Sequence, residues 1–236
     1  MFEKLYHFIK NIALKNKLNL INSLQPQKGR ILDIGAGTGE FLSVAKNDGW
    51  QTIGVEPSDK AKAIAKNKGV SFVEQTNELE SHSFDVISMW HVLEHVPDLE
   101  NQIRELKRLI KPNGTVIIAV PNFKSFDASY YGNFWAAYDV PIHLWHFSKT
   151  AIKKLFIKEN LELVNVLPMK VSAETYEKLK AEGCIKQKDG DVYDKTKIYE
   201  CDITHLPVVN RKYVSTPFTS TSFCEKHIQL HIAKTN

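Results

Sequence analysis

Three glycines at alternating positions are the clearest chemical feature of this 236-residue chain: Gly35, Gly37 and Gly39. They follow an apolar, β-branched run, Ile31–Ile34, and precede Glu40–Asp48, which has the pattern of a helix. Glycine adopts positive φ values and lets the backbone approach a ligand closely, because it has no Cβ. A helix that begins at such a turn directs free N–H groups toward an anionic ligand. The segment therefore predicts a cofactor cradle.

Acidic residues stand at two key positions around this turn. Asp33 directly precedes the glycines, and Glu56 ends the next apolar run, Thr52–Val55. A carboxylate at the tip of the second strand can accept hydrogen bonds from both hydroxyls of a ribose. The spacing G-x-G-x-G differs from the dinucleotide fingerprint G-x-G-x-x-G, since the third glycine comes one residue early. That difference argues against a nicotinamide-dependent enzyme, which stays as one alternative.

Together these residues resemble the class I methyltransferases that use S-adenosylmethionine. Further segments extend the resemblance: Phe84–Ile87 with His91–Asp98, the turn Lys111–Val116, and Pro141–Ser148. The last of these is similar to a segment of the bacterial small-molecule branch that contains the ubiquinone-biosynthesis O-methyltransferases. The resemblance covers roughly residues 15–168 and consists of ordered motifs at sensible spacing.

The resemblance implies S-adenosylmethionine as the cofactor and assigns roles to individual residues. The three glycines would contact its methionine and ribose parts through the backbone, Asp33 would orient their loop, and Glu56 would hold the ribose. Gln75 and Thr76 follow the third strand, where the family places its adenine contacts and often has an acid. The complete implied set is Asp33, Gly35, Ala36, Gly37, Gly39, Glu56, Pro57, Gln75, Thr76, Trp90 and His91.

A segment rich in aromatic residues, 121–148, follows the fifth expected strand and interrupts the alternation of strands and helices. Open α/β sheets bind ligands at the carboxyl ends of their strands, so this segment is expected to cover the substrate. Its histidines bring titratable groups to that place, and histidine accepts a hydroxyl proton near neutral pH. We expect His143 to act as a general base, with His146 as the next candidate.

Two groups of metal-ligand residue types need separate treatment. His91-x-x-Glu94-His95 spells the H-x-x-E-H pattern of one zinc-peptidase class, but that pattern binds metal on a long helix, and here Pro97 follows closely. The relatives named above tend to carry an acid where His91 stands. We therefore expect no metal at this segment.

The second group lies near the end of the chain and comprises Cys201, His205, Cys224, His227 and His231. On a helix, the last three would share one face and could bind zinc. On a strand they would fall on opposite faces. The alternation of Ile228, Leu230 and Ile232 favours the strand, while zinc binding stays open.

The order of elements predicts how these residues are positioned. Strands are expected at Ile31–Ile34, Thr52–Val55, Val70–Val73, Phe84–Met89, Thr115–Val120, Leu161–Leu167 and around Ile228–Ile232, and helices at Glu40–Asp48, Asp59–Lys68, Leu99–Ile110, Ser148–Asn160 and Ala173–Glu182. Strict alternation with apolar strands predicts a Rossmann-like, doubly wound α/β sheet. We expect it to be mostly parallel, with an antiparallel last strand. The predicted division is a cofactor-binding domain over residues 1–170 and an atypical extension over 171–236, which serves as a substrate cover or as an insertion before the last strand.

Composition narrows the function classes. The net charge of +4 does not argue for nucleic acid binding, for which a concentrated basic face is expected, and no apolar run reaches the ~20 residues of a membrane span. The three widely spaced cysteines favour a reducing cytoplasm. Residues 1–29 predict a helix over the cofactor mouth, with Lys17 reaching a cofactor carboxylate. A transit peptide or a membrane-surface helix is the alternative for that segment.

The expected activity is transfer of a methyl group to a hydroxyl or amine of a small, partly apolar molecule by in-line displacement. Because the sulfonium is already activated, the protein mainly aligns and desolvates the nucleophile. The alternative is a cofactor-binding subunit without catalysis of its own, whose extension binds a protein partner.

Overall fold

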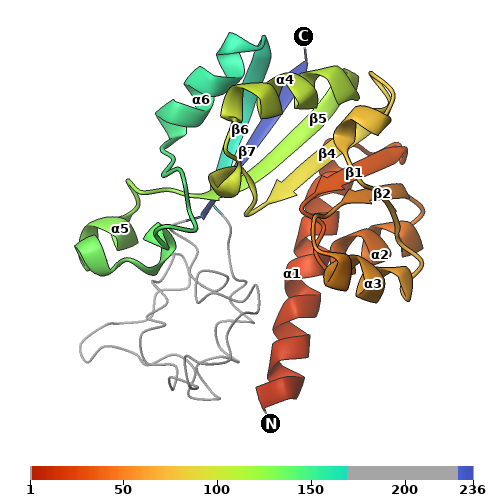
Figure 1. Ribbon diagram of the computed structural model, residues 1–236, viewed down its shortest axis with the longest axis horizontal. Helices are drawn as coiled ribbons and strands as arrows, with labels where there is room; N and C mark the ends of the chain where they lie inside the picture. The colour runs from red at the N-terminus through yellow and green to blue at the C-terminus, as the bar shows by residue number, and fades with distance from the viewer. Residues whose placement is uncertain (1, 169–227, 236) are drawn as a thin grey trace.

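A computed structural model describes residues 2–168 and 228–235 (Figure 1). Its strands are β1 (Arg30–Ile34), β2 (Gln51–Val55), β3 (Ser71–Val73), β4 (Phe84–Trp90), β5 (Ile110–Pro121), β6 (Leu161–Pro168) and β7 (Ile228–Thr235). Its α-helices are α1 (Phe2–Leu24), α2 (Glu40–Asn47), α3 (Asp59–Lys66), α4 (Leu99–Leu109), α5 (Phe126–Tyr131) and α6 (Lys149–Lys158). Short 3₁₀ turns are η1 (Thr76–Glu78), η2 (Leu93–His95), η3 (Gly132–Phe134) and η4 (Ala136–Tyr138).

The strands form a seven-stranded sheet in the order β3-β2-β1-β4-β5-β7-β6. The first five are parallel, whereas β7 lies antiparallel between β5 and β6. The chain passes from β1 to β2 on one side and later returns to place β4 on the other, so the topological switch point lies between β1 and β4. Ligands bind at such points, beyond the carboxyl ends of the strands.

Helices cover both faces of the sheet, and alternate strand residues face each layer. On one face, Leu32, Ile87 and Val116 pack beneath α4 and α6. On the other face, Ile31 and Val86 pack beneath α1, α2 and α3. The expected doubly wound α/β fold with an antiparallel last strand is confirmed.

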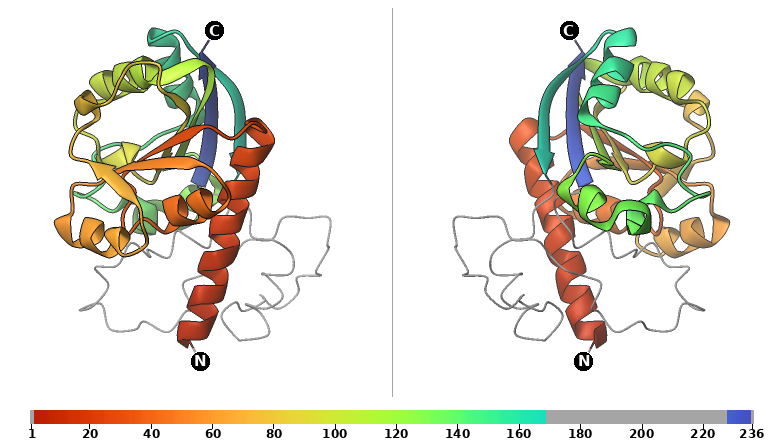
Figure 2. Two further views of the ribbon diagram at one scale, coloured as in Figure 1. Left: turned by 90° about the vertical axis from the view of Figure 1, so that its right-hand side faces the viewer. Right: turned by 90° about the vertical axis from the view of Figure 1, so that its left-hand side faces the viewer.

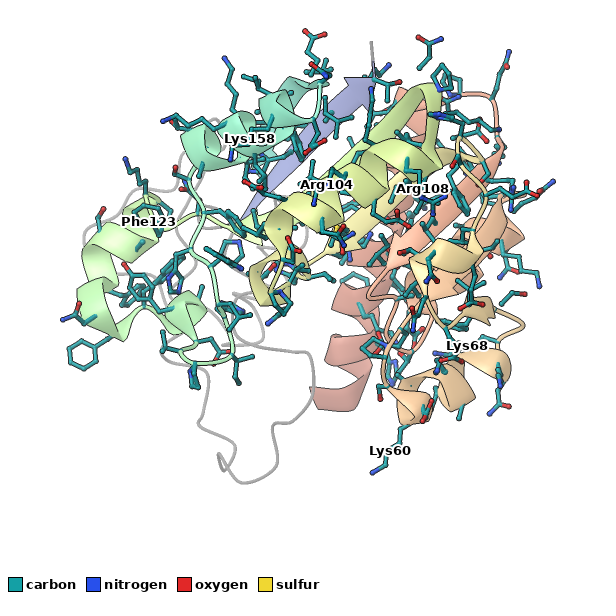
Figure 3. All side chains as sticks on the ribbon, turned by 45° about the horizontal axis from the view of Figure 1, so that its top comes forward. Lys60, Lys68, Arg104, Arg108, Phe123 and Lys158 are labelled. Atoms are coloured by element: carbon teal, nitrogen blue, oxygen red, sulfur yellow. The ribbon has the colours of Figure 1, made fainter. Side chains whose placement is uncertain are left out.

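Local sequence signals account for where several helices begin. The side chains of Ser58, Asp98 and Ser148 accept hydrogen bonds from backbone N–H groups in the first turns of α3, α4 and α6. Such caps satisfy donors that have no partner within the helix. Glu100 Oε1 of α4 lies 2.6 Å from Lys158 Nζ of α6, and Arg104, Arg108 and Lys158 can be followed along this helical layer in Figure 3.

The long helix α1 extends well past the sheet (Figures 1 and 2). Its C-terminal half packs on the core through Leu14, Leu18 and Ile21. Within the described ranges, none of the helices is both long and apolar enough to cross a membrane.

The structure differs from the expected elements mainly at β5. The turn residues Lys111–Gly114 lie within β5, which begins at Ile110 because an irregularity in its pairing with β4 accommodates them. The aromatic segment forms α5, η3 and η4, with Trp135 and Ala137 buried in a small core of their own. The expected helix Ala173–Glu182 lies outside the described residues.

Candidate functional site

The glycine turn joins the carboxyl ends of β1 and β2. The backbone N–H groups of Gly35 and Ala36 both donate to the carbonyl of Val55, at 2.8 and 3.1 Å. Gly39 is the N-cap residue of α2, so the turn leads directly into that helix. The predicted strand–turn–helix arrangement therefore stands at the carboxyl edge of the sheet.

Gly35 and Gly37 of the turn have different surroundings. A Cβ on Gly35 would lie 2.3 Å from Cγ2 of Val92, so this glycine is needed for close packing against the loop after β4. A Cβ on Gly37 would meet nothing within 4 Å, although its φ of +53° is in the left-handed region. The protein thus leaves open space directly at Gly37, at the switch point of the sheet.

Glu56 closes the second side of this space. Its Oε2 accepts a 2.8 Å hydrogen bond from Gly37 N, and its Oε1 accepts one of 2.9 Å from Ser58 N. Each carboxylate oxygen keeps a further lone pair that can accept a hydrogen bond. Glu56 is half-buried and Pro57 next to it is exposed. The carboxylate is therefore positioned by backbone on both sides of the space.

Two oppositely charged groups lie at the α1 side of the turn. Asp33 is buried, and Ser88 Oγ donates to its Oδ1 at 2.6 Å. Burial raises the pKa of Asp33 to about 7, against the opposing effects of the Ser88 hydrogen bond and the Lys17 charge. Burial of the Lys17 ammonium lowers its pKa to about 8, although the charge of Asp33 favours the protonated form.

Trp90 completes this part of the site. The Lys17 ammonium lies over its ring, 4.2 Å from the centroid, and Phe41 meets it edge-on. Its Nε1 is buried with no hydrogen-bond partner in the described part of the chain. α1 thus contributes a cation to the cofactor side of the sheet.

The residues expected at the adenine lie after β3, farther along the same edge. Gln75 is exposed, and its backbone N–H donates to Glu78 Oε1 at 2.8 Å, which begins the turn η1. Thr76 is half-buried, and its carbonyl accepts a hydrogen bond from Arg108 Nη2. Both side chains stay predictions as adenine contacts.

The loop after β4 combines a left-handed backbone conformation with a buried carboxylate. His91 has a φ of +59°, and its Nδ1 lies 3.6 Å from Glu94 Oε1. Glu94 is buried, yet neither of its carboxylate oxygens has a hydrogen-bond partner among the described residues. Glu94 was expected to fix this loop and not to take part in catalysis, and its position in H-x-x-E-H was the available signal for a further role.

The predicted bases lie in the aromatic segment. His143 is half-buried and its Nδ1 contacts the Ala137 carbonyl at 2.8 Å, while exposed His146 contacts the Tyr138 carbonyl through Nε2 at 2.9 Å. The His143 ring also meets that of His95 edge-on. Both assignments stay predictions.

The aromatic segment is tied to the loop after β4. Glu94 O accepts from Leu144 N at 2.8 Å, and Trp145 Nε1 donates to Val96 O at 2.7 Å. Within the described chain, Glu94, His95 and His143 offer ligand atoms within 4.8 Å of one another, a group that could surround a cation. In the structure, His95 Nδ1 contacts the Ile142 carbonyl instead, which links the same two segments.

The histidine and cysteine group near the end of the chain is only partly described. Cys201, His205, Cys224 and His227 lie outside the described residues. His231 is on β7, opposite Ile118 of β5, and is buried with Nδ1 unpartnered within the described ranges. The strand expected there is confirmed.

The residues around Gly37 fit the parts of S-adenosylmethionine. The open space beside the backbone admits a ligand, and the carboxylate of Glu56 suits ribose hydroxyls. Asp33 and Lys17 carry opposite charges that influence each other, and these would match the ammonium and the carboxylate of an amino acid. The donor set thus complements a zwitterionic amino acid joined to a sugar.

Comparisons with known proteins point to one enzyme family. The profile of a family described as "Methyltransferase domain" matches residues 3–166. The ubiquinone biosynthesis O-methyltransferase of Vibrio cholerae is 32% identical over 126 residues, which cover 49% of this chain and 51% of the relative. The chain spans about half the length of the curated relatives it matches.

Solved structures share the fold at low sequence identity. A methyltransferase from Archaeoglobus fulgidus superposes with a TM-score of 0.62 at 17% identity, over 96% of this chain and 94% of that one. A phosphoethanolamine N-methyltransferase of Haemonchus contortus, solved with S-adenosylhomocysteine, gives a TM-score of 0.58 at 18% identity, over 94% of this chain and 53% of that one.

Proposed function

The chain belongs to the methyltransferase-domain family, and we propose that it transfers a methyl group from S-adenosylmethionine to a hydroxyl or amine of a small molecule. The observation that carries the proposal is the open space at Gly37, bounded by Glu56 at the switch point of the sheet. Glu56 accepts a hydrogen bond from the backbone of the turn at this open position, which sets it apart from an open turn elsewhere on the surface.

S-adenosylmethionine is the cofactor, and it supplies an electrophilic methyl group on a sulfonium centre when bound. Glu56 would hold the ribose hydroxyls, and the backbone at Gly35–Gly39 would lie against the ligand. Asp33 would pair with the ammonium of the amino acid and Lys17 with its carboxylate. Trp90 would then border the methionine part, since its ring already lies under the Lys17 ammonium.

A small and partly apolar acceptor is supported by the segment after β5. This segment is fixed next to the loop that follows β4 by the backbone contacts of Leu144 and Trp145 with Glu94. It also exposes several large apolar side chains: Phe134, Val140, Ile142, Leu144 and Trp145. The named function of the Vibrio cholerae relative, O-methylation in ubiquinone biosynthesis, supports a hydroxyl as the acceptor group.

Calorimetric titration with S-adenosylhomocysteine and with NAD tests the cofactor part of the proposal. Binding of the first ligand and no heat with the second is the expected result, and the reverse would overturn it. Turnover is then tested by incubating the protein with S-adenosylmethionine and mixed phenols, catechols and amines, with mass spectrometry to detect added methyl groups. Tight S-adenosylhomocysteine binding with no methylation of any acceptor would favour a binding subunit that needs a partner.

A further inference from the structure

We infer that His91, oriented by Glu94, accepts the proton of the acceptor hydroxyl, an inference that rests on the proposed methyltransferase function. The sequence had predicted the base at His143 or His146, and neither His91 nor Glu94 was expected to be catalytic. Position, backbone conformation and the electrostatics of Glu94 each support His91.

The position of His91 is fixed at the switch point. It directly follows the last residue of β4, the strand between β1 and β5, and its backbone N–H donates to Ala119 O of β5 at 3.0 Å. The next residue, Val92, packs against Gly35 so closely that Gly35 tolerates no Cβ. The His91 backbone is therefore adjacent to the glycine turn, where the reactive end of the cofactor must lie.

The backbone of His91 is in the left-handed region, which is uncommon for residues with a Cβ. Its φ of +59° is left-handed, which for a residue with a Cβ costs about 1–2 kcal/mol. Such strain persists where the surrounding structure enforces it, and it concentrates at functional sites. About a third of the side chain stays exposed, so the imidazole can meet a ligand.

Glu94 gives the imidazole a defined orientation. Its side chain is 1% exposed, and both carboxylate oxygens lack a hydrogen-bond partner in the described chain. A buried carboxylate without a donor is strongly disfavoured. His91 Nδ1, 3.6 Å from Oε1, is placed to donate after a small rotation of the ring. Catalytic contacts of this kind are often long before the ligands bind.

This contact decides which ring nitrogen can act as a base. With the proton on Nδ1 facing Glu94, the lone pair is on Nε2, which is directed away from the carboxylate. The acceptor oxygen forms a bond to the methyl carbon while the carbon–sulfur bond breaks and its electron pair remains on sulfur. The hydroxyl proton passes to Nε2, and Glu94 stabilises the resulting imidazolium.

The other histidines near the site have different partners. A backbone carbonyl engages one ring nitrogen in each of His95, His143 and His146. These contacts hold the aromatic segment to itself or to the loop after β4. His91 directly follows β4, and its Nδ1 lies 3.6 Å from the buried carboxylate of Glu94, which ring nitrogens of His95 and His143 also approach. A base and its positioning residue are arranged in this way.

Nitrogen NMR of the wild-type protein with ¹⁵N-labelled histidine, bound to S-adenosylhomocysteine at alkaline pH, tests the orientation directly. The His91 resonances are identified by their loss in His91→Asn. The expected result is the neutral ring with its proton on Nδ1, and a shift toward the Nε2-protonated form in Glu94→Gln. A ring protonated on Nε2 in the wild type would overturn the inference, because Nε2 could not then accept a proton.

Methylation of catechol, used as a probe acceptor, tests the role. His91→Asn should lower the rate by about a hundredfold or more, the range for loss of a general base. His82→Asn is the matched control, since exposed His82 also has a left-handed φ, +52°, and asparagine tolerates that conformation. Glu94→Gln, which alters the positioning residue, should lower the methylation rate roughly tenfold.

The outcomes separate this inference from the proposed function. Failure of the wild type to bind S-adenosylhomocysteine would refute the proposed function. Normal binding and an equal rate in His91→Asn and His82→Asn would refute only the role of His91. Loss of wild-type turnover in a chelator, restored by a divalent metal, would also overturn it in favour of metal activation at Glu94. If catechol is not methylated, the NMR result alone decides.

Discussion

The backbone N–H of Gly37 donates a 2.8 Å hydrogen bond to Oε2 of Glu56, which joins the glycine turn after β1 to the tip of β2. This contact connects two residues that each belong to a separate strand–loop–helix unit. It holds the glycine turn against the tip of β2.

Gly37→Ala should weaken S-adenosylhomocysteine binding by about tenfold or more, because its Cβ would enter the open space. Gly132→Ala is a control for the added methyl group, since Gly132 also has a φ of +53° and a Cβ there also meets nothing within 4 Å. Both variants should lose stability through backbone strain. Calorimetry should show the loss of affinity in Gly37→Ala alone, and equal affinities would contradict the cradle.

Glu56→Gln should also weaken this binding, by about tenfold to a hundredfold, the equivalent of about 1.5–3 kcal/mol for hydrogen bonds to a charged group. The amide has only one oxygen with which to replace two, so it cannot accept from both Gly37 and Ser58 and also from a ribose. Glu100→Gln is the control, because Glu100 forms an exposed pair with Lys158 on the helical layer. An unchanged dissociation constant in Glu56→Gln would remove the ribose assignment.

Binding should strengthen as pH rises through about 7. Burial raises the pKa of Asp33 to about 7, and the ammonium of S-adenosylhomocysteine favours its ionised form, so binding at lower pH requires loss of a proton. The expected change is about tenfold between pH 6 and 7.5. Titrations of Asp33→Asn should lack this dependence, whereas exposed Asp59→Asn should keep it.

Above about pH 8 the opposite trend should appear. The pKa of Lys17 is lowered to about 8 by burial, and a neutral amine attracts the cofactor carboxylate less. Lys17→Met should bind more weakly at pH 7 and lose less affinity at higher pH than the wild type. Lys15→Met, which replaces an exposed lysine on the same helix, should behave like the wild type. The amino group of S-adenosylhomocysteine also titrates in this range, but its effect is the same for all three proteins and cancels in the comparison.

Acid should destabilise the fold through His231. Burial lowers its pKa to about 4 in the folded protein, below the ordinary value of 6.5 that applies when unfolded. The unfolded chain therefore binds the proton first, and stability present above pH 6.5 is lost as pH falls toward 4. The contribution of His231 to the free energy of unfolding that is lost in this way approaches about 3 kcal/mol.

Urea unfolding at several pH values checks this expectation. His231→Leu should show a smaller loss of unfolding free energy between pH 6.5 and 4 than the wild type. His82→Asn, with an exposed histidine replaced, should follow the wild type. Parallel curves for all three proteins would contradict the role of His231.

Short-range patterns were sufficient for most of the fold. Apolar strands, the glycine turn and caps such as Ser148 act within a few residues, so they determine local structure wherever the chain folds. The alternation near Ile228 correctly indicated a final strand. The pairing irregularity that extends β5 to Ile110 was not predicted, because it depends on the partner strand β4.

The sequence by itself determined the α/β class, the glycine turn after β1 and the acid at the tip of β2, since each of these is written in contiguous motifs. Only the tertiary structure brought Lys17 of α1 over Trp90 of β4, and buried Glu94 with its Oε1 3.6 Å from Nδ1 of His91. Those contacts join distant segments, and their energies depend on burial. A linear sequence gives the charge of a side chain, whereas its desolvation is set by what packs around it.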